Sequence, residues 1–417
     1  MSRKLDLPAT STRNTEKIRQ RTPSRRAIRD GLVLKIDPDA CLEPSQDNTS
    51  QRCNTLTTTT PSTMPCKPAI CSHSLGRAWV HDMPEKLDQA ARYGFDIELF
   101  YEDLYYIAKN LPGGPIPENQ LAAAHIIRAM CDERGIAIVC LQPFMHYEGL
   151  RDRRKHAERI EEMKLWIEMA KALDTHIISI PSTFLSQEKM SGDPDLITED
   201  LREVADLGAP EGIQFAYESL AWGTYSDTWE QSWKIVQLVD RPNFGLCLDT
   251  YNIAGRCYAD PASADRRIRN AEAEVKASIE RLVSTVDPNK IVYVQVVDAE
   301  YLADPLIEGH KYHVEGQPAR MSWSRNCRLF YGEQDRGAYL PIHAILKAIL
   351  VDLKFNGWVS AEMFNISLAD WRPSVPEQHA HRAAISWEKI VSDFNLASQT
   401  ERTRPAIGAP AAPRAQL

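Results

Sequence analysis

Eight short apolar runs, each followed by a stretch with helical periodicity, recur between residues 67 and 395. Each run is almost continuously apolar, as expected of parallel strands that are covered on both faces. Eight strand–helix units that close on themselves form a TIM (β/α)8 barrel, an α/β fold that makes one domain. The expected strands are 68–72, 95–100, 136–142, 176–181, 213–218, 244–249, 291–297 and 358–363. The expected helices are 84–93, 118–133, 151–172, 196–207, 228–240, 261–284, 340–352 and 378–394.

The boundaries of these helices are marked by residues that favour helix ends. The stretch 151–172 carries apolar residues at helical spacing with charges between them, which is typical of a helix that lies on a sheet. Pro84 and Asp227 are expected near helix starts, and Gly94 at a helix end. An open doubly wound sheet is the alternative fold, but it usually has a Gly-rich loop after its first strand, and none follows 68–72.

The two ends of the chain lack this pattern. Residues 1–66 and 396–417 contain few large apolar side chains, so we expect a disordered arm and a disordered tail around a barrel at 67–395. The arm is rich in Arg, Ser and Thr, which leaves mitochondrial targeting as the alternative to a cytoplasmic location. Asp6 and Glu16 argue against such targeting, because these segments are poor in acids.

The composition excludes several classes of protein. A net charge of −8 argues against a nucleic-acid binder, which needs a basic surface. No window approaches the roughly 18 apolar residues of a membrane span, so no membrane partner is expected. The nine cysteines form no CxxC pair, and we expect most of them to be buried and reduced. A small-molecule substrate is therefore expected; an oligomer remains open.

Polar residues stand at or near the ends of five of the expected strands. Carboxylates or amides inside apolar strands cost several kcal/mol unless they are paired or bind an ion, and catalytic groups of a barrel lie at these strand ends. Glu218, Asp249, Gln295 and Glu362 fall on consecutive strands and are predicted to hold a divalent cation, Mg²⁺ or Mn²⁺, because their donors are hard oxygens. Glu98 ends the second strand. The alternative is that each acid pairs separately with an Arg or Lys.

Several motifs carry a family resemblance that spans about 67–395. They are ICSHSLGRAWVHDMPEKLDQAARYGFDIELFYEDL at 70–104, LQPFMHYEGLRDR at 141–153, YESLAWGTY at 217–225, LCLDTYNIAGR at 246–256 and ARMSWSRNCRLFYGE at 319–333. With them the chain resembles the xylose-isomerase-like TIM barrels and, more closely, the fungal-type 3-dehydroshikimate dehydratases. The resemblance implies a metal-dependent hydro-lyase that converts 3-dehydroshikimate to protocatechuate in quinate and shikimate catabolism.

The chemistry of this reaction agrees with the predicted metal site. A cation that chelates the substrate's ketone and neighbouring hydroxyl lowers the cost of removing the proton between them and stabilises the enediolate. Loss of water and aromatisation then follow. The resemblance carries the family's metal ligands onto Glu218, Asp249, Gln295 and Glu362. Glu218 and Glu362 are catalytic candidates as well, because a metal-bound carboxylate is one of the groups that can take the proton.

The substrate is a carboxylate, so an arginine is expected to bind it. The resemblance places Arg328, in the loop after the seventh strand, in the site. Arg151, after the third strand, is a second substrate-binding candidate, and Arg325 is a competing one. His310 and His313 belong to the long loop after the seventh strand, which is expected to act as a lid.

The group that removes the proton remains open. Some relatives have His three residues after the strand-six Asp, where this chain has Asn252. Asn252 is predicted as a catalytic residue that can hydrogen-bond substrate but cannot be a base. Tyr217 and His146 are predicted to contact substrate and, with Glu98, are candidates for the base by position. His73 is interpreted as a local hydrogen-bonding residue.

Three other functions are weighed. The run WSRNCRLF fits a nuclease of the same superfold, but such an enzyme holds zinc through many His residues, and none falls at the predicted ligand positions. A sugar or inosose isomerase, epimerase or dehydratase acts on neutral polyols, for which site arginines have no use. A non-enzymatic binding barrel predicts bound metal without turnover.

Overall fold

The structure is a computed structural model that describes residues 66–396. The predicted arm at 1–66 and tail at 396–417 lie outside this range, apart from Cys66 and Leu396. Cys66 is buried, and its thiol donates to the carbonyl of Phe355 at 3.5 Å. The first strand of the barrel begins at the next residue, Lys67.

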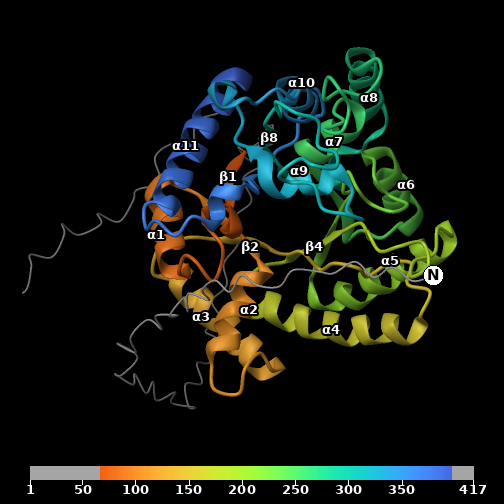
Figure 1. Ribbon diagram of the computed structural model, residues 1–417. Coiled ribbons are helices and arrows are strands. Elements are labelled where there is room, and N and C mark those ends of the chain that lie inside the picture. The colour runs from red at the N-terminus through yellow and green to blue at the C-terminus, as the bar shows by residue number, and fades with distance from the viewer. Residues whose placement is uncertain (1–65, 397–417) are drawn as a thin grey trace, which may run out of the picture. The chain divides into compact units, whose positions relative to one another are not determined.

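Eight parallel strands close into one barrel, in the order β1-β10-β7-β6-β5-β4-β3-β2, and helices surround them (Figure 1). The predicted TIM barrel is confirmed. All eight predicted strands are present, although several are shorter than the apolar runs. They are β1 (Lys67–Cys71), β2 (Asp96–Phe100), β3 (Ile138–Gln142), β4 (Ile177–Pro181), β5 (Gln214–Glu218), β6 (Phe244–Asp249), β7 (Ile291–Gln295) and β10 (Trp358–Ala361).

The helices are more numerous than predicted. The α-helices are α1 (Met83–Tyr93), α2 (Tyr101–Asn110), α3 (Pro117–Asp132), α4 (Arg153–Ala172), α5 (Pro194–Gly208), α6 (Trp229–Val239), α7 (Thr250–Cys257), α8 (Ala271–Thr285), α9 (Ala319–Cys327), α10 (Ile342–Leu346) and α11 (Val375–Phe394). Short 3₁₀ helices cover Ser72–Leu75, Ala209–Glu211, Pro288–Lys290, Gln334–Arg336 and Ile366–Ala369, and a π-helix covers Lys347–Asp352.

Three helices, α2, α7 and α9, were not predicted. α2 and α7 begin at the residue after a strand ends, so their first turns merge with an apolar run in the sequence. The expected helix at 261–284 was too long, because α8 begins only at Ala271. The residues before it form a turn, in which the amide of Asp260 donates to the carbonyl of Arg266 at 3.1 Å.

Side chains and backbone geometry set the helix ends. Gly94 ends α1 in the left-handed conformation, with φ of 79°, as predicted. Pro84 lies in the first turn of α1. The expected start of α6 at Asp227 was one residue early, because Thr228 is the N-cap and forms a capping box with Gln231.

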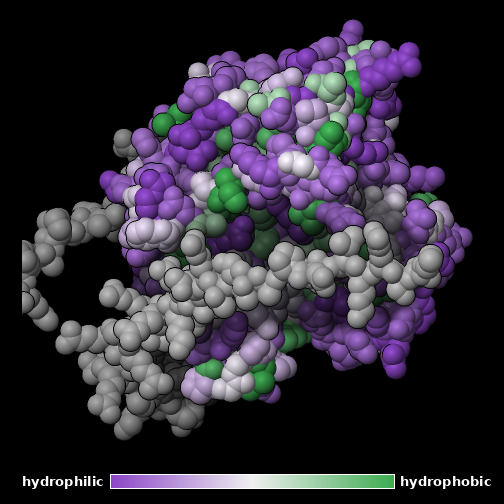
Figure 2. All heavy atoms as spheres, in the orientation of Figure 1, coloured by the Kyte–Doolittle hydropathy of each residue, from purple (hydrophilic) through white to green (hydrophobic). Residues whose placement is uncertain are grey.

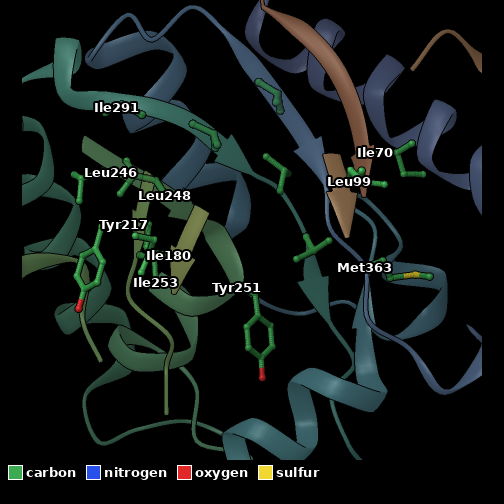
Figure 3. Packing of buried hydrophobic residues seen from close by; sticks show 14 of the residues in the cluster. Ile70, Leu99, Ile180, Tyr217, Leu246, Leu248, Tyr251, Ile253, Ile291 and Met363 are labelled. Carbon is green, nitrogen blue, oxygen red and sulfur yellow. The ribbon is translucent and has the colours of Figure 1, made fainter. Parts of the chain in front are cut away.

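Two hydrophobic regions hold the barrel together. Outward-facing strand residues such as Ile180, Leu246 and Leu248 pack under the helices (Figure 3). A smaller cluster, made of Ala69, Val139, Cys140, Ala216, Cys247 and Tyr293, fills the inside of the barrel. Because successive residues of a strand face opposite sides, Glu218 follows Ala216 inward and Asp249 follows Cys247 inward. The polar residues at the strand ends therefore stand on top of this internal cluster.

The segment after β7 returns to the barrel mouth through a small antiparallel ribbon. β8 (Asp298–Ala299) pairs with β9 (Arg328–Leu329), and α9 ends directly before β9. The amide of Arg328 also donates to the carbonyl of Phe364 at 3.0 Å, which ties β9 to the loop after β10. These contacts hold the Arg328 backbone beside the ends of the barrel strands.

The seven cysteines of the described residues are free, and all but Cys257 are buried, which agrees with their predicted role as small apolar residues. Cys41 and Cys53 fall outside those residues. Within 66–396, none of the helices is both long and apolar enough to cross a membrane.

A buried ion pair joins the first two helices. The Lys86 Nζ donates to Asp103 Oδ1 at 2.6 Å, and the Ser72 hydroxyl donates to Asp103 Oδ2 at 2.7 Å. Both charged side chains are almost fully buried. Removing one partner would leave the other charge buried without its counter-ion.

We expect Lys86→Met to lower the free energy of unfolding by about 3–5 kcal/mol, because Asp103 would be buried without its cation. Urea unfolding followed by circular dichroism measures the change. The double variant Lys86→Met/Asp103→Leu should recover a large part of the loss. A single variant as stable as the unmodified protein would contradict a stabilising role for the pair.

Candidate active site

Three buried carboxylates meet at the C-terminal ends of the strands. Glu218 is the last residue of β5, Asp249 is the last of β6, and Glu362 directly follows β10. Oxygen atoms from the three side chains all lie within 4.8 Å of one another. Burial raises the pKa of Glu218 and of Glu362 well above the usual range, and the charge of Asp249 raises both further. The arrangement therefore calls for positive charge at this point.

Arg328 supplies one positive charge. Its Nη1 donates to Asp249 Oδ2 and to Glu362 Oε2, both at 2.9 Å. Its Nε donates to the hydroxyl of Ser324, in α9, at 2.9 Å. Burial opposes the charge on the guanidinium, but Asp249 and Glu362 outweigh burial and raise the pKa of Arg328. The side chain is thus locked against two of the acids.

Asn252 lies against two of the acids. Its Nδ2 donates to Glu218 Oε1 at 2.7 Å and to Asp249 Oδ2 at 2.8 Å, while its Oδ1 accepts from the amide of Ala221 at 2.9 Å. The side chain is buried and does not line the cavity described below. Asn252 therefore holds two of the carboxylates in place, and its part in catalysis stays a prediction.

Gln142 is a site residue that the sequence interpretation missed. It ends β3, and its Nε2 donates to Glu362 Oε1 at 2.9 Å. With Arg328 on the other oxygen, both oxygens of Glu362 are held. A signal was present, because Gln142 is a polar residue that closes a buried apolar strand, as the predicted ligands do.

Glu98 and Gln295 lie deeper in the barrel. Both side chains are fully buried, and neither lines the cavity. Gln295 Nε2 donates to Glu98 Oε1 at 2.7 Å. Gln295 is paired in register with Asp249 of the neighbouring strand, which places the amide beside the three carboxylates. A carboxylate oxygen of Glu98 lies within 4.8 Å of one of Glu362, which does line the cavity, and the role of Glu98 as the base stays a prediction.

A cavity of about 160 Å³ opens above the acids. The surface in Figure 2 is mostly hydrophilic, whereas the cavity walls are largely apolar. Its apolar lining is Phe100, Pro143, Met145, Pro181, Phe184, Leu220, Trp222 and Phe364. Its polar lining is Gln142, Glu218, Ser324, Arg325, Arg328 and Glu362.

The remaining candidates for substrate contact lie off the cavity wall. Arg151 is exposed, and its Nε donates to the carbonyls of Gln187 and Met190, both at 3.0 Å. His146 packs behind Phe184, with ring centroids 4.4 Å apart. Burial lowers the pKa of His146 to about 4.

Tyr217 also faces away from the cavity. It precedes Glu218 on β5, so the two side chains point to opposite faces of the strand. Figure 3 shows it among the buried hydrophobic residues, and its hydroxyl donates to Glu148 Oε1 at 3.2 Å. The backbone amide and hydroxyl of Thr183 also donate to Glu148, at 2.7 and 2.9 Å. Tyr217 thus belongs to a buried hydrogen-bond cluster with Glu148 and Thr183 and does not line the cavity.

The three other histidines that the sequence singled out are also off the cavity wall. His73 packs against the cavity residues Phe100 and Phe364, with ring centroids 4.8 and 4.9 Å away. His310 and His313 lie between β8 and α9 and do not line the cavity, whereas α9 contributes Ser324 and Arg325 to it. The lid stays a prediction.

The donor set suits a divalent cation. Glu218, Asp249 and Glu362 provide hard carboxylate oxygens, of the kind that divalent cations take as ligands. Gln295 is the predicted fourth ligand; it is in register with Asp249, and its amide oxygen accepts from the Cys247 thiol at 3.3 Å. Three buried acids beside one arginine also leave negative charge that a cation would neutralise. The residues therefore fit the predicted cofactor class.

The fold and the site first identify the broad class to which the protein belongs. The chain belongs to the xylose isomerase-like TIM barrel family, whose model matches residues 87–389. In the solved structure of a xylose isomerase-like TIM barrel/4-hydroxyphenylpyruvate dioxygenase fusion protein, the matched region is 25% identical, with a TM-score of 0.60. The match covers 79% of this chain and 43% of the fusion protein.

Within that class, the chain belongs to the family of the 3-dehydroshikimate dehydratase of Neurospora crassa. The two are 54% identical over 343 residues, which is 80% of this chain and 96% of the Neurospora protein. A 3-dehydroshikimate dehydratase of Pseudomonas aeruginosa is 29% identical over 286 residues, which is 68% of this chain and 36% of that protein. The resemblance read from the sequence motifs is thereby confirmed.

The buried Glu148 predicts a specific pH dependence of stability. Burial raises its pKa from 4.5 to about 7, so its contribution to stability is full below pH 4.5 and is lost as the pH rises to 7. Glu148→Gln removes this loss. We expect the variant to gain about 3 kcal/mol relative to the unmodified protein between pH 4 and pH 8. Urea unfolding across this range measures the gain.

The exposed Glu161, which pairs with Lys164 on the surface of α4, provides the matched control. Glu161→Gln should show a nearly constant difference from the unmodified protein over the same pH range. If Glu148→Gln also differed from the unmodified protein by a constant unfolding free energy, burial would not raise the pKa of Glu148, and the prediction would be contradicted.

Proposed function

We propose that this protein removes one molecule of water from 3-dehydroshikimate and releases protocatechuate. The observation that carries the proposal is that Glu218, Glu362 and Arg328 line a cavity with apolar walls, with the buried Asp249 directly beside them. The 54% identity to the Neurospora dehydratase along nearly its whole length supports the choice of substrate. The reaction needs no oxidant, because loss of one water converts the substrate ring directly into the aromatic product.

Glu218, Asp249, Gln295 and Glu362 are the proposed ligands of a divalent cation, Mg²⁺ or Mn²⁺. When bound there, such a cation acts as a Lewis acid that makes the carbon beside the substrate's ketone easier to deprotonate. Arg328, Asn252 and Gln142 hold three of these ligands at fixed positions through the hydrogen bonds described above. These hydrogen bonds fix the ligands before substrate binds, and such preorganisation lowers the activation barrier of a polar reaction.

The proton must go to a group on the cavity wall. Among the cavity residues, Glu218 and Glu362 are the acids within reach of a bound ring. The acid that takes the proton from carbon returns it to the leaving hydroxyl, which departs as water, so the acid ends the reaction in its starting state. Phe100, Phe184 and Phe364 shield the ring from bulk water, which strengthens the electrostatic interactions inside the cavity.

Arg328 is the proposed binding group for the substrate's carboxylate, and Arg325 stands beside it on the same wall. Arg328 uses Nη1 and Nε for protein contacts, and its Nη2 has no hydrogen bond to any residue in the described part of the chain. A guanidinium with one edge free can still donate to a carboxylate. Arg325 donates from Nη1 to the Gln317 side chain at 3.1 Å.

A sugar or inosose isomerase of the same barrel family is the alternative. Its substrates carry no charge, so two arginines on the cavity wall would have no partner in them. The cavity therefore favours an anionic substrate over a neutral polyol. We also place the reaction in quinate and shikimate catabolism and the protein in the cytoplasm, where thiols such as the buried free cysteines stay reduced.

The proposal predicts that the purified protein forms protocatechuate from 3-dehydroshikimate when Mg²⁺ or Mn²⁺ is present. The ultraviolet absorbance of the product measures the rate. Treatment with a chelator should abolish the rate, and adding the cation should restore it. Failure to form product with any divalent cation would contradict the proposed reaction.

Glu362→Gln keeps the size of the side chain but removes a charged ligand. We expect it to lower kcat/KM by at least roughly 100-fold, since even residues behind the ligands are worth about 10–100-fold. It should also raise the Mn²⁺ concentration needed for half-maximal rate. Retained activity at low Mn²⁺ would exclude Glu362 as a ligand.

Arg328→Lys tests the binding of the substrate carboxylate. It keeps a positive charge near Asp249 but loses the planar fork, so kcat/KM should fall about 10–100-fold. Arg151→Met is the matched control, because Arg151 lies off the cavity, and it should leave the kinetics unchanged. The reverse pattern would move the carboxylate site to the loop after β3.

A further inference from the structure

Glu98 sits at the centre of a hydrogen-bond network beneath the proposed cation site. Its Oε1 accepts from Gln295 Nε2 at 2.7 Å and from the Tyr293 hydroxyl at 2.9 Å. Its Oε2 accepts from the Ser360 hydroxyl at 2.5 Å. The side chain is 0% exposed. These partners come from β7 and β10, so one carboxylate links three strands of the barrel through its interior.

This carboxylate restricts the orientation of the neighbouring amide. Both oxygens of Glu98 already accept hydrogen bonds, from the hydroxyls of Tyr293 and Ser360, so Gln295 meets Glu98 with its NH₂ group. The amide oxygen must then point the other way, and there the Cys247 thiol donates to Gln295 Oε1 at 3.3 Å. Cys247 precedes Asp249 by two residues on the inner face of β6. The oxygen therefore faces β6 at a point two residues before Asp249, the acid of the site on that strand.

A glutamine without such a partner is ambiguous as a ligand, because its oxygen and nitrogen can exchange places by a rotation of half a turn. Only the oxygen can bind a cation, since the NH₂ group has no lone pair to offer. Residues behind the ligands of a metal often fix the ligands in this way. Here the group behind the ligand is a buried acid that does not line the cavity.

We propose that Glu98 is a positioning residue that holds the Gln295 amide with its oxygen toward the divalent cation. The proposal rests on the cation site of the proposed function. It predicts an effect on cation affinity that passes through Gln295 and through no other ligand. A merely structural role for Glu98 would change stability without this dependence.

The test measures Mn²⁺ binding to the whole chain by the loss of the free-ion electron paramagnetic resonance signal, without substrate. Glu98→Gln should weaken Mn²⁺ binding about 10–100-fold, because the new amide can donate to Gln295 Oε1 and let that amide turn around. Glu148→Gln replaces a buried acid outside the site and should leave Mn²⁺ binding within about 3-fold of the unmodified chain.

In a second variant, the presence of Glu98 reverses the change in Mn²⁺ affinity that the substitution alone would cause. Gln295→Glu adds a fourth negative ligand, which by itself would tighten Mn²⁺ binding. With Glu98 directly behind it, the new carboxylate meets a like charge, so binding should instead weaken by at least about 10-fold. Exchanging both residues, Glu98→Gln together with Gln295→Glu, restores one donor and one acceptor and should recover most of the lost affinity.

Each outcome decides the proposal. Tighter binding in Gln295→Glu, or losses that simply add in the double variant, would overturn the positioning role of Glu98. Unchanged binding in Glu98→Gln would do the same and leave the proposed function intact. An unmodified chain that binds no Mn²⁺ would overturn both. If Glu98→Gln does not fold, the Gln295→Glu measurement alone still decides by its sign.

Discussion

The mutual repulsion of three buried carboxylates is the constraint on which the rest of the site depends. Glu218, Asp249 and Glu362 place oxygens within 4.8 Å of one another in a water-poor barrel mouth, an arrangement that is unfavourable unless positive charge and hydrogen-bond donors surround it. The chain supplies both, from Arg328, Asn252 and Gln142. The donors come from the loop after β7, the first turn of α7 and the end of β3, so satisfying the acids also ties these segments together.

The barrel explains why such an arrangement can be built. Eight parallel strands bring their C-terminal ends to one rim, and the alternation of side chains sends every second residue inward. Below the rim, a small hydrophobic cluster and the Glu98 network fill the interior. Above it, aromatic side chains form a cavity of about 160 Å³. The carboxylates thus lie between the filled interior of the barrel and the apolar cavity, at the ends of the core strands.

Much of this could be predicted from the sequence, because the signals were local. Each strand was an apolar run, and Glu218, Asp249, Gln295 and Glu362 stood out as polar residues near the ends of such runs. The errors came from contacts between segments that are distant in the sequence. Nothing local distinguishes Arg328, held by two acids, from Arg151, which binds loop carbonyls. Tyr217 is the exception, since its position next to Glu218 on one strand already required it to face outward.

The central claim is that these four strand-end residues hold one divalent cation. Anomalous diffraction from crystals of the protein grown with Mn²⁺ tests it most directly. The account predicts a single strong peak within about 2.1–2.3 Å of oxygens from Glu218, Asp249, Glu362 and Gln295. A peak elsewhere, or no peak among these residues at saturating Mn²⁺, would contradict it.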